Sequence, residues 1–502
     1  MLNKRPSYFI RSTINPDKYV IDYDINDLVK KHTQPKDWLN HLHNDLLKFW
    51  DCSDAITMEY SLFPTFRGNH GQVLSPDGKD LPPEIIEAIK DPETKNLIDL
   101  ERNYIKMHSR QTYAYGIAYH ITGEEKYLQL CKKGAYSMIQ NAKDDSHGLF
   151  TNQNRISGTW GDSQKERNSQ ELAYGLLGIG MYYYLTHDPY ALHTILECKE
   201  YIFRNYFSRG KGYFTWLPSD IASKTVDISA QLDQLYAYML LVTPALPEPY
   251  QTQWKSDLKM IVNILIKRFY SERYGFFWGN ESSEKNHSFG NSHTDFGHSV
   301  KTFWLIYQIG CYLDETSFIN FARPNIDAVL ADAYVAPDRN TPGSWGRRYN
   351  KDGSFDNTKE WWQLAELDQA CGILSLNDPS YLAYLNETYK YWFQFMIDKE
   401  YGEIWHMVDG DTNEPILKYP KIHQWKACHH SFEHCLFGYL ISSQIKNSDF
   451  ILYYAFTDKS EVNYNRVRPY FFDAYIKKTD MEYFHQIDDD TNKIKVKFNS
   501  LH

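Results

Sequence analysis

Apolar residues recur along most of the chain with a period of about 3.6 residues, the spacing of an amphipathic helix. The clearest segments are 109–119, 170–185, 231–242, 254–269, 298–313, 361–374, 384–397 and 431–443. Strand-like alternation is rare before residue 445, which disfavours a β-rich fold. The pattern predicts a mainly helical, all-α domain at residues 1–445, whose regular part begins near residue 37.

Short glycine–aromatic stretches separate the predicted helices. They are Gly148-Leu-Phe, Gly212-Tyr-Phe-Thr-Trp, Tyr274-Gly-Phe-Phe-Trp and Tyr401-Gly-Glu-Ile-Trp. Each predicts a turn or a small hairpin that links two helices. Because they recur roughly every 50 to 70 residues, the repeated unit is a helical hairpin that occurs about six times. Hairpins that return side by side can close into a ring, so we expect an αα-barrel whose inner helices line a funnel.

Residues 446–502 have a different pattern. The segments Phe450-Ile-Leu-Tyr-Tyr-Ala-Phe, Arg468-Pro-Tyr-Phe-Phe-Asp-Ala and Lys493-Ile-Lys-Val-Lys-Phe predict three strands with turns between them. No Pro- or Ser-rich linker precedes them, so a separately folded domain is not expected. We expect an appended β-rich element that packs on the barrel or on a partner subunit, and a homodimer stays open.

Charge and cysteine usage narrow the classes of function. The net charge is −10 and the pI is about 6.0, which leaves no basic surface for nucleic acid. The seven cysteines are scattered without CxxC spacing, which predicts reduced thiols in the cytoplasm. The first residues lack the apolar core of a signal peptide, and no apolar run approaches the roughly 18 residues of a membrane span.

Aromatic residues make up 16% of the chain, including 40 Tyr and 13 Trp. Tyr and Trp combine an apolar face with a polar tip, which suits a wide and partly wet cavity. A large aromatic core would give the same composition. Composition alone does not distinguish a cavity from a core, so we turn to the segments that contain candidate catalytic residues.

The first such segment is Asn291-Ser-His-Thr-Asp-Phe-Gly-His-Ser-Val-Lys-Thr-Phe-Trp304. A loop ends at its glycine, and His298 opens an apolar helix on which Lys301 and Trp304 share roughly the same face. A histidine at the mouth of an inner helix can take a proton from a carbon acid near neutral pH. A helix-capping or hydrogen-bonded core histidine is the alternative.

The second segment is His423-Gln-Trp-Lys-Ala-Cys-His-His-Ser-Phe-Glu-His434. Its histidines raise the possibility of a metal cluster, since zinc sites use three or four His, Cys or carboxylate ligands. On a helix, however, His429 and His430 are about 100° apart, so we expect at most one of them to share a face with His434. No predicted helix offers an H-E-x-x-H face or a Cys pair at ligand spacing, so we predict no catalytic metal. We also expect no cofactor.

The third segment is Lys359-Glu-Trp-Trp-Gln-Leu-Ala-Glu366. Paired tryptophans one turn before an acidic residue suit stacking on a sugar ring and recognition of its hydroxyl groups. A Trp-rich core with a solvent-facing Glu366 is the alternative.

Together these segments resemble the N-acylglucosamine 2-epimerase family, which includes cellobiose epimerases and mannose-type aldose–ketose isomerases. Gly297-His-Ser-Val-Lys301 is similar to the family's G-H-x-x-E, and 359–366 to its K-x-W-W-x-Q-A-E. Trp425-Lys-Ala-Cys-His-His430 is similar to W-K-G-P-(aromatic)-H, 108–110 to the early Q-A-R segment, and 398–405 to D-x-x-x-G-E-W. The resemblance spans roughly residues 37 to 445.

The resemblance implies an (α/α)6 barrel and a metal-free proton transfer on a free sugar through a cis-enediolate. Two histidines act as acid and base, and His298 and His430 occupy the matched positions. His429 stands where the family has an aromatic residue, and Arg110 where it has an arginine that holds sugar oxygens. The expected carbohydrate-binding residues are Arg110, Asp233, Lys301, Trp304, Trp362, Glu366 and His429.

Several positions depart from the family pattern. The glutamate three residues after the first histidine is Lys301, the glutamine before A-E is Leu364, and the arginine three residues after the second histidine is Glu433. An inner-helix M-H-x-x-E pattern is replaced by residues 230–234, which include Asp233. We expect Lys301 either to make the site electropositive, which favours an anionic substrate, or to pair with Asp233, Glu366 or Glu433.

Two other functions stay open on the sequence alone. A glycoside hydrolase or lyase can use the same barrel, with a carboxylate pair drawn from Asp233, Asp295 and Glu366. A non-sugar or non-catalytic role is the other, suggested by Lys301 and Glu433. Two histidines at one cavity favour isomerisation over both.

Overall fold

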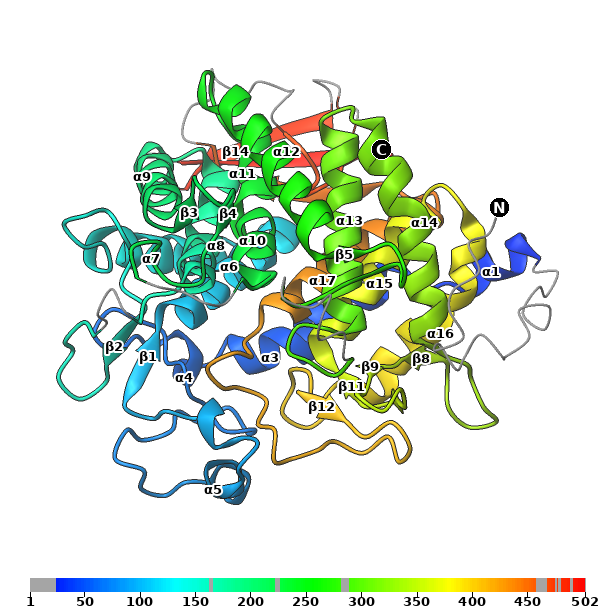
Figure 1. Ribbon diagram of the computed structural model, residues 1–502, viewed down its shortest axis with the longest axis horizontal. Coiled ribbons are helices and arrows are strands. Elements are labelled where there is room, and N and C mark those ends of the chain that lie inside the picture. Colours follow the sequence, from blue (N-terminus) through cyan, green and yellow to red (C-terminus); the bar gives the residue numbers. More distant parts are fainter. Residues whose placement is uncertain are drawn as a thin grey trace.

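The computed structural model describes residues 24–161, 166–221, 226–280, 289–456, 467–474, 476, 480–487 and 491–501. Helices dominate these residues, and the strands form short antiparallel pairs plus one three-stranded sheet (Figure 1). No helix among them is long and apolar enough to cross a membrane.

Six helical segments in the described part of the chain are buried on nearly all sides and form an inner ring. A helix that is apolar around its whole circumference needs neighbours on every face. They are α6 (Ile105–Thr122), α8 (Ser169–Thr186), the continuous run α10 (Ser229–Gln234), η5 (Leu235–Met239) and α11 (Leu240–Val242), α13 (Phe296–Tyr312), α15 (Trp361–Ser375) and α17 (His429–Ile445).

Amphipathic helices form an outer ring around them. In α7, for example, Tyr127, Cys131, Ala135 and Met138 are buried at helical spacing while the opposite face is exposed. The outer segments are α2 (Pro35–His41), η3 (Leu42–Leu46) and α3 (Leu47–Trp50), then α7 (Glu125–Asn141), α9 (Pro189–Tyr206), α12 (Tyr250–Phe269), α14 (Thr316–Ala333), and α16 (Leu382–Tyr391) with η9 (Trp392–Met396).

The ring closes where α17 packs against α2 and α6. Trp38 of α2 donates a hydrogen bond from its indole N–H to Ser442 of α17, and its ring contacts His434 edge-on. Since outer and inner helices alternate along the chain, the expected (α/α)6 barrel of antiparallel hairpins is confirmed.

Short strand pairs lie at the end of the barrel where the inner helices begin. β8, β9, β11 and β12 gather there at the lower end of α13 and α14 in Figure 1. The pairs are β1 (Arg102–Tyr104) with β2 (Asn152–Asn154), β3 (Phe207–Ser208) with β4 (Tyr213–Phe214), β5 (Tyr270–Ser271) with β6 (Phe276–Phe277), β7 (Tyr334–Val335) with β8 (Ser344–Trp345), β9 (Arg348–Tyr349) with β10 (Phe355–Asp356), and β11 (Lys359–Glu360) with β12 (Met407–Val408).

The glycine–aromatic stretches form turns or hairpins, as predicted. Residues 213–214 and 276–277 are strands β4 and β6, while Leu149 and Ile404 form isolated bridges to Lys143 and Ile397. Smaller elements precede the barrel or connect its helices. They are α1 (Ile25–Lys31), α4 (Ser53–Ile56), α5 (Pro83–Lys90), η4 (Lys95–Leu97), η6 (Thr243–Ala245) and η8 (Pro379–Tyr381).

The C-terminal residues form a three-stranded antiparallel sheet in the order β13–β15–β14. The strands are β13 (Phe450–Tyr454), β14 (Met481–Gln486) and β15 (Asn492–Phe498). The predicted strand at 468–474 is wrong, because this segment forms a turn whose aromatic side chains pack on the barrel.

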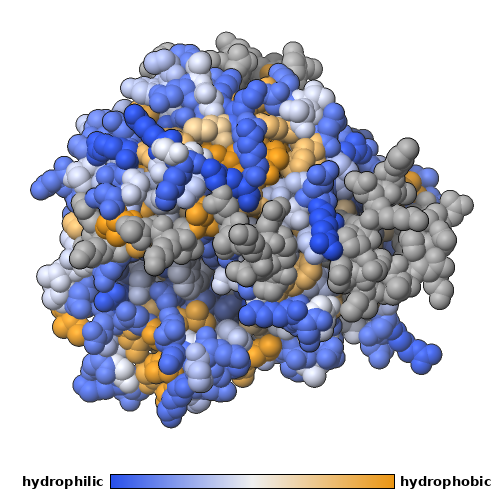
Figure 2. All heavy atoms as spheres, viewed as in Figure 1, coloured by the Kyte–Doolittle hydropathy of each residue, from blue (hydrophilic) through white to orange (hydrophobic). Residues whose placement is uncertain are grey.

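The sheet lies at the opposite end from the strand pairs, in red at the top of Figure 1. Tyr119 of α6 donates from its hydroxyl to the carbonyl of Tyr454, and the ring of Tyr453 covers Gly123. The two ends of the barrel therefore differ: one carries the strand pairs and the other the C-terminal sheet. Figure 2 shows that polar residues cover most of the visible face and that its surface is hollowed near the centre.

Candidate active site

All residues expected in the site lie on inner helices, which begin next to the strand pairs. Arg110 comes from α6 and Asp233 from α10; His298, Lys301 and Trp304 come from α13; Trp362 and Glu366 come from α15; and His429 and His430 come from α17. All are buried except His298 and Trp362, which are half-buried. The structure therefore gathers residues that are far apart in the sequence.

His298 lies in the first turn of α13 beside a carboxylate that fixes its orientation. Oδ1 of Asp295 accepts from the backbone N–H of His298, which caps the helix, and Oδ2 lies 2.8 Å from Nδ1 of the ring. Burial raises the pKa of Asp295, but the adjacent His298 outweighs burial and holds this pKa below its ordinary value. An ionised carboxylate keeps the proton on Nδ1, so Nε2 carries the lone pair.

Gly297 precedes His298 because α13 and α15 approach closely at this point. A Cβ at Gly297 would lie 2.6 Å from Cγ of Gln363 and 2.8 Å from Cη2 of Trp362. The ring of Trp362 lies 4.6 Å from that of His298, and its distance to the ring of His430 is 6.0 Å. One indole therefore contacts both predicted catalytic histidines.

His430 and Glu366 form the second pair of an imidazole and a carboxyl group. Nδ1 of His430 lies 3.4 Å from Oε1 of Glu366. Burial, His429 and Lys301 all lower the pKa of His430 well below its ordinary value. Burial raises the pKa of Glu366 to about 8, although Lys301 opposes the rise. At neutral pH, therefore, the proton of this pair rests on Glu366 and His430 is uncharged.

Glu366 also links the pair to the barrel core. Its Oε2 accepts a hydrogen bond of 2.8 Å from the indole N–H of Trp304, and no part of Glu366 is exposed. The alternative of a solvent-facing Glu366 is therefore wrong. Trp304 itself is fully buried and contacts Phe437 and Phe471, so it lies deeper than the histidines.

His429 belongs to the same cluster as His430. The expectation that the two rings diverge by about 100° is wrong, because side-chain rotamers bring them back together. Their ring centroids are 4.0 Å apart. The hydroxyl of Tyr236 lies 2.9 Å from Nε2 of His429 and 3.3 Å from Nδ1 of His430.

Lys301 faces the barrel interior and pairs with Asp233. The distance from Nζ to Oδ1 is 3.0 Å, and both side chains are buried. Gln170 donates to the other oxygen of Asp233, and Nζ lies 3.5 Å from the ring centre of Tyr236. Burial lowers the pKa of Lys301, but Asp233 outweighs burial and holds it above the ordinary value. The positive charge of Lys301 is thus largely neutralised by its partner.

Arg110 is a buried cation with spare hydrogen-bonding capacity. Its Nη1 donates to the carbonyl of Trp425 at 3.2 Å, and the guanidinium lies 4.1 Å from the ring centre of Tyr174. Its Nε is buried without a hydrogen-bond partner among the described residues. A guanidinium in this state suits an oxygen-rich ligand.

Tyr236 and His293 are site residues that the sequence did not single out. Tyr236 follows Asp233 by three positions, so helical spacing alone could have placed both on one face. The ring of His293 lies 4.7 Å from that of His298, and its Nδ1 is 3.0 Å from Asp227. Burial lowers the pKa of His293, but the carboxylate of Asp227 outweighs burial and holds this pKa above its ordinary value.

His429, His430 and Glu433 offer three ligand atoms within 4.8 Å of one another. The hydroxyl of Tyr236 already lies at this point, since it donates to Glu433 and is within hydrogen-bond distance of both histidines. A metal ion there would have to displace that hydroxyl or take it as a ligand. Metal-free chemistry stays a prediction.

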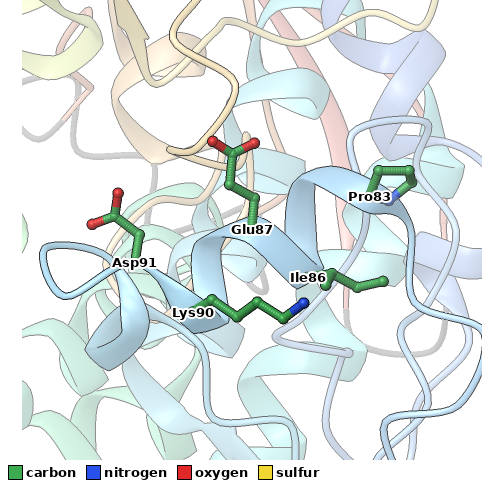
Figure 3. A pocket seen from close by; sticks show the side chains of 5 residues that line it. All are labelled: Pro83, Ile86, Glu87, Lys90 and Asp91. Carbon is green, nitrogen blue, oxygen red and sulfur yellow. The ribbon is translucent and has the colours of Figure 1, made fainter.

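The carboxylates considered for glycan cleavage are each engaged by a neighbour. Asp233 is paired with Lys301, Asp295 with His298, and Glu366 with Trp304. A separate depression lies on α5, outside the barrel, and Figure 3 shows its lining side chains. They are Pro83, Ile86, Glu87, Lys90 and Asp91. None of them is a histidine or an aromatic residue, so the depression does not resemble the barrel site.

Residues 93–429 match the family model of N-acylglucosamine 2-epimerase (GlcNAc 2-epimerase). No curated protein matches the sequence. The fold is similar to that of a cellobiose 2-epimerase from Bacillus thermoamylovorans, with a TM-score of 0.64 and 17% identity over 81% of this chain and 98% of that one. A D-mannose isomerase is similar with a TM-score of 0.64 and 15% identity, over 80% of this chain and 97% of that one. A sugar epimerase from a ruminal bacterium is similar with a TM-score of 0.62 and 16% identity, over 81% of this chain and 98% of that one.

At these sequence identities the solved structures establish the fold, whereas the family model establishes which family the chain belongs to. The model matches from before α6 to the first residue of α17, so it includes His298, Trp362 and Glu366. The resemblance expected from the sequence is confirmed. The chain belongs to the N-acylglucosamine 2-epimerase family.

Proposed function

We propose that the protein is a carbohydrate epimerase or aldose–ketose isomerase in which His298 and His430 transfer a proton at the carbon beside the sugar carbonyl. The observation that carries the proposal is the shared environment of the two rings. Each has Nδ1 beside a carboxyl group, and both contact Trp362. Removing a proton beside a carbonyl requires a base near neutral pH, which imidazole provides.

His298 is the proposed base. Asp295 is ionised and lies 2.8 Å from Nδ1, so the lone pair is on Nε2. The carboxylate also stabilises the imidazolium that forms when Nε2 takes the proton. Because 14% of the His298 side chain is exposed, substrate can reach it.

His430 is the proposed acid. The uncharged imidazole of His430 carries a single ring proton, and the proposal places it on Nε2, from which it can be donated. The opposite assignment operates in the reverse reaction. The proposal therefore pairs two neutral imidazoles of opposite tautomer, one with a lone pair on Nε2 and the other with a proton there.

Charge develops on the enediolate oxygens during such a transfer. The guanidinium of Arg110 has an unused buried donor and is the proposed partner of these oxygens. Trp362 offers a ring face for the sugar. Lys301 contributes less, because Asp233 neutralises most of its charge.

A panel of free aldoses and ketoses, both neutral and anionic, tests the proposal when products are identified by NMR. We expect interconversion of C2 epimers or of an aldose and its ketose. The matched variants are His298→Asn, which should abolish the conversion, and His193→Asn, an exposed histidine on α9 that should leave it unchanged. Cleavage of oligosaccharides without any isomerisation would contradict the proposal.

We also propose that the protein works in a reducing compartment, the cytoplasm, since all seven cysteines are free thiols in the structure. The homodimer stays a prediction, as does the division of the chain into a barrel at residues 1–445 and an appended β-rich element at 446–502. Sedimentation analysis measures the first, and expression of residues 1–445 alone tests the second.

A further inference from the structure

The turn at 467–474 inserts Tyr470 into the barrel from the end that carries the C-terminal sheet. Tyr470 has a φ of 61°, which is uncommon for a bulky residue. The hydroxyl of Tyr184 on α8 holds this conformation, because it accepts from the backbone N–H of Tyr470 and donates to the carbonyl of Arg468. The side chain of Tyr470 is consequently buried and its direction is fixed.

The hydroxyl of Tyr470 reaches a buried carboxyl group on α17. It donates to Oε1 of Glu433 at 2.5 Å. Tyr113 of α6 donates to the same oxygen at 3.2 Å, and its hydroxyl is also 2.5 Å from that of Tyr470. One oxygen of Glu433 is therefore held by a residue of the barrel and by a residue of the C-terminal segment.

The other oxygen of Glu433 connects to the histidines. Oε2 accepts from the hydroxyl of Tyr236, which in turn lies 2.9 Å from Nε2 of His429 and 3.3 Å from Nδ1 of His430. A hydroxyl that donates to Glu433 can accept from Nε2–H of His429 with its remaining lone pairs. An unbroken series of hydrogen bonds thus runs from Tyr470 to His429, whose ring lies 4.0 Å from that of His430.

We propose that Tyr470 is a positioning residue for His429 and His430, acting through Glu433 and the hydroxyl of Tyr236. The inference rests on the proposed function, in which His430 is the acid. Tyr470 lies beyond residues 93–429, so the family match does not include it. Glu433, where the family pattern has an arginine, is the residue that allows the connection.

A purely structural role would not need the hydroxyl. The neighbouring Phe471 and Phe472 already pack on Phe437, at ring distances of 6.3 and 5.4 Å. The ring of Tyr470 also contacts Phe437, at 5.9 Å, and a phenylalanine would keep that contact. Tyr470→Phe therefore separates the hydrogen bond from the packing.

Glu433 is surrounded by groups that control its ionisation. Tyr236, Tyr470, Tyr113 and Gln369 donate to it. The charge of Lys301 and the carboxyl group of Glu366 also act on it. Burial raises the pKa of Glu433, and each donor opposes that rise. Removing the Tyr470 hydroxyl should thus raise the pKa of Glu433 further.

In Tyr470→Phe we expect kcat to fall by about 10-fold to 100-fold, the value of one hydrogen bond to a charged group, with KM within about twofold. The acid limb of the kcat profile should move to higher pH. The matched control is Tyr119→Phe, which removes another buried hydroxyl between barrel and C-terminal sheet without touching Glu433. It should leave kcat and the pH profile unchanged.

A double-mutant cycle with Glu433→Gln decides whether the effect passes through Glu433. In the Glu433→Gln background, Tyr470→Phe should change kcat by less than about twofold, because coupled residues are not additive. Equal losses in both backgrounds, or a wild-type pH profile for Tyr470→Phe, would overturn the proposal.

An infrared titration of the Glu433 carboxyl, taken as the difference between wild type and Glu433→Gln, needs no substrate. A higher midpoint in Tyr470→Phe supports the contact even if no sugar is turned over, which would refute only the proposed function. An unchanged midpoint overturns the positioning role whatever the enzyme does.

Discussion

The substitution Asp295→Asn separates the orientation of His298 from the fold of its helix. Oδ1 of Asp295 caps α13 and Oδ2 lies 2.8 Å from Nδ1 of His298. An asparagine keeps the oxygen that caps the helix. Its amide nitrogen then faces Nδ1 and donates to it, so the imidazole proton moves to Nε2 and the base is lost.

The magnitudes follow from the two separate contacts. Loss of general-base catalysis typically lowers turnover by about 10²–10⁴, so kcat should fall by that factor. One charge-assisted hydrogen bond contributes about 1.5–3 kcal/mol, and the retained cap limits the loss of stability to that value or less. Activity should therefore fall far more than stability does.

Initial rates and urea unfolding on the same preparation measure both quantities. Asp368→Asn is the matched control, since Asp368 also contacts a histidine, His434 at 3.0 Å, but on the buried wall between α15 and α17. It should lower stability and leave kcat within a few-fold of normal. If Asp295→Asn stayed folded and kept more than a tenth of kcat, Asp295 would not orient the base.

Two further predictions concern buried charges, and a third concerns a metal ion. The pKa of Glu366 is about 8 in the folded chain against an ordinary 4.5, so the folded state holds an extra proton between these values. The contribution of this proton to stability is complete below pH 4.5 and is lost as pH rises to 8. The free energy of unfolding of wild type relative to Glu366→Gln, measured in urea, should therefore decline over that interval. A difference that stays constant with pH would contradict the raised pKa of Glu366. Lys301→Met leaves Asp233 buried without its cation and should cost about 3 kcal/mol, with a smaller loss in the double variant with Asp233→Asn; additive losses would show that the two are not coupled. Dialysis against EDTA should leave turnover unchanged, because the Tyr236 hydroxyl lies where the possible metal ligands His429, His430 and Glu433 converge. Loss of turnover in EDTA that a single divalent ion restores would contradict this prediction.

The helical barrel could be predicted because the sequence shows both the helical periodicity and the short connectors between helices. Outer helices such as α7 bury one face, and the short connectors carry glycine and aromatic residues at each return of the chain. The turn at 467–474 was misread as a strand for a related reason. Its aromatic residues are as typical of a strand as of a contact, and here they pack on Phe437 in the barrel.

Contacts between distant helices could not be predicted. Lys301 had three acidic partners to choose from, and the choice of Asp233 depends on how α10 and α13 are placed in the ring. Tyr236 lies 193 residues from His429, so nothing local in the sequence links them. The convergence of His429 and His430 depends on side-chain torsions, which helical spacing does not specify.

The central claim is that two histidines transfer a proton at the carbon beside a sugar carbonyl, and solvent deuterium tests it most directly. The enzyme is incubated in D2O with each aldose of the panel, and NMR follows deuterium at C2 of aldose products and at C1 of ketose products. The account predicts that wild type incorporates deuterium and that His298→Asn and His430→Asn each incorporate it at least about 100-fold more slowly. Product formation without deuterium at either of these carbons, or normal incorporation by both variants, would contradict it.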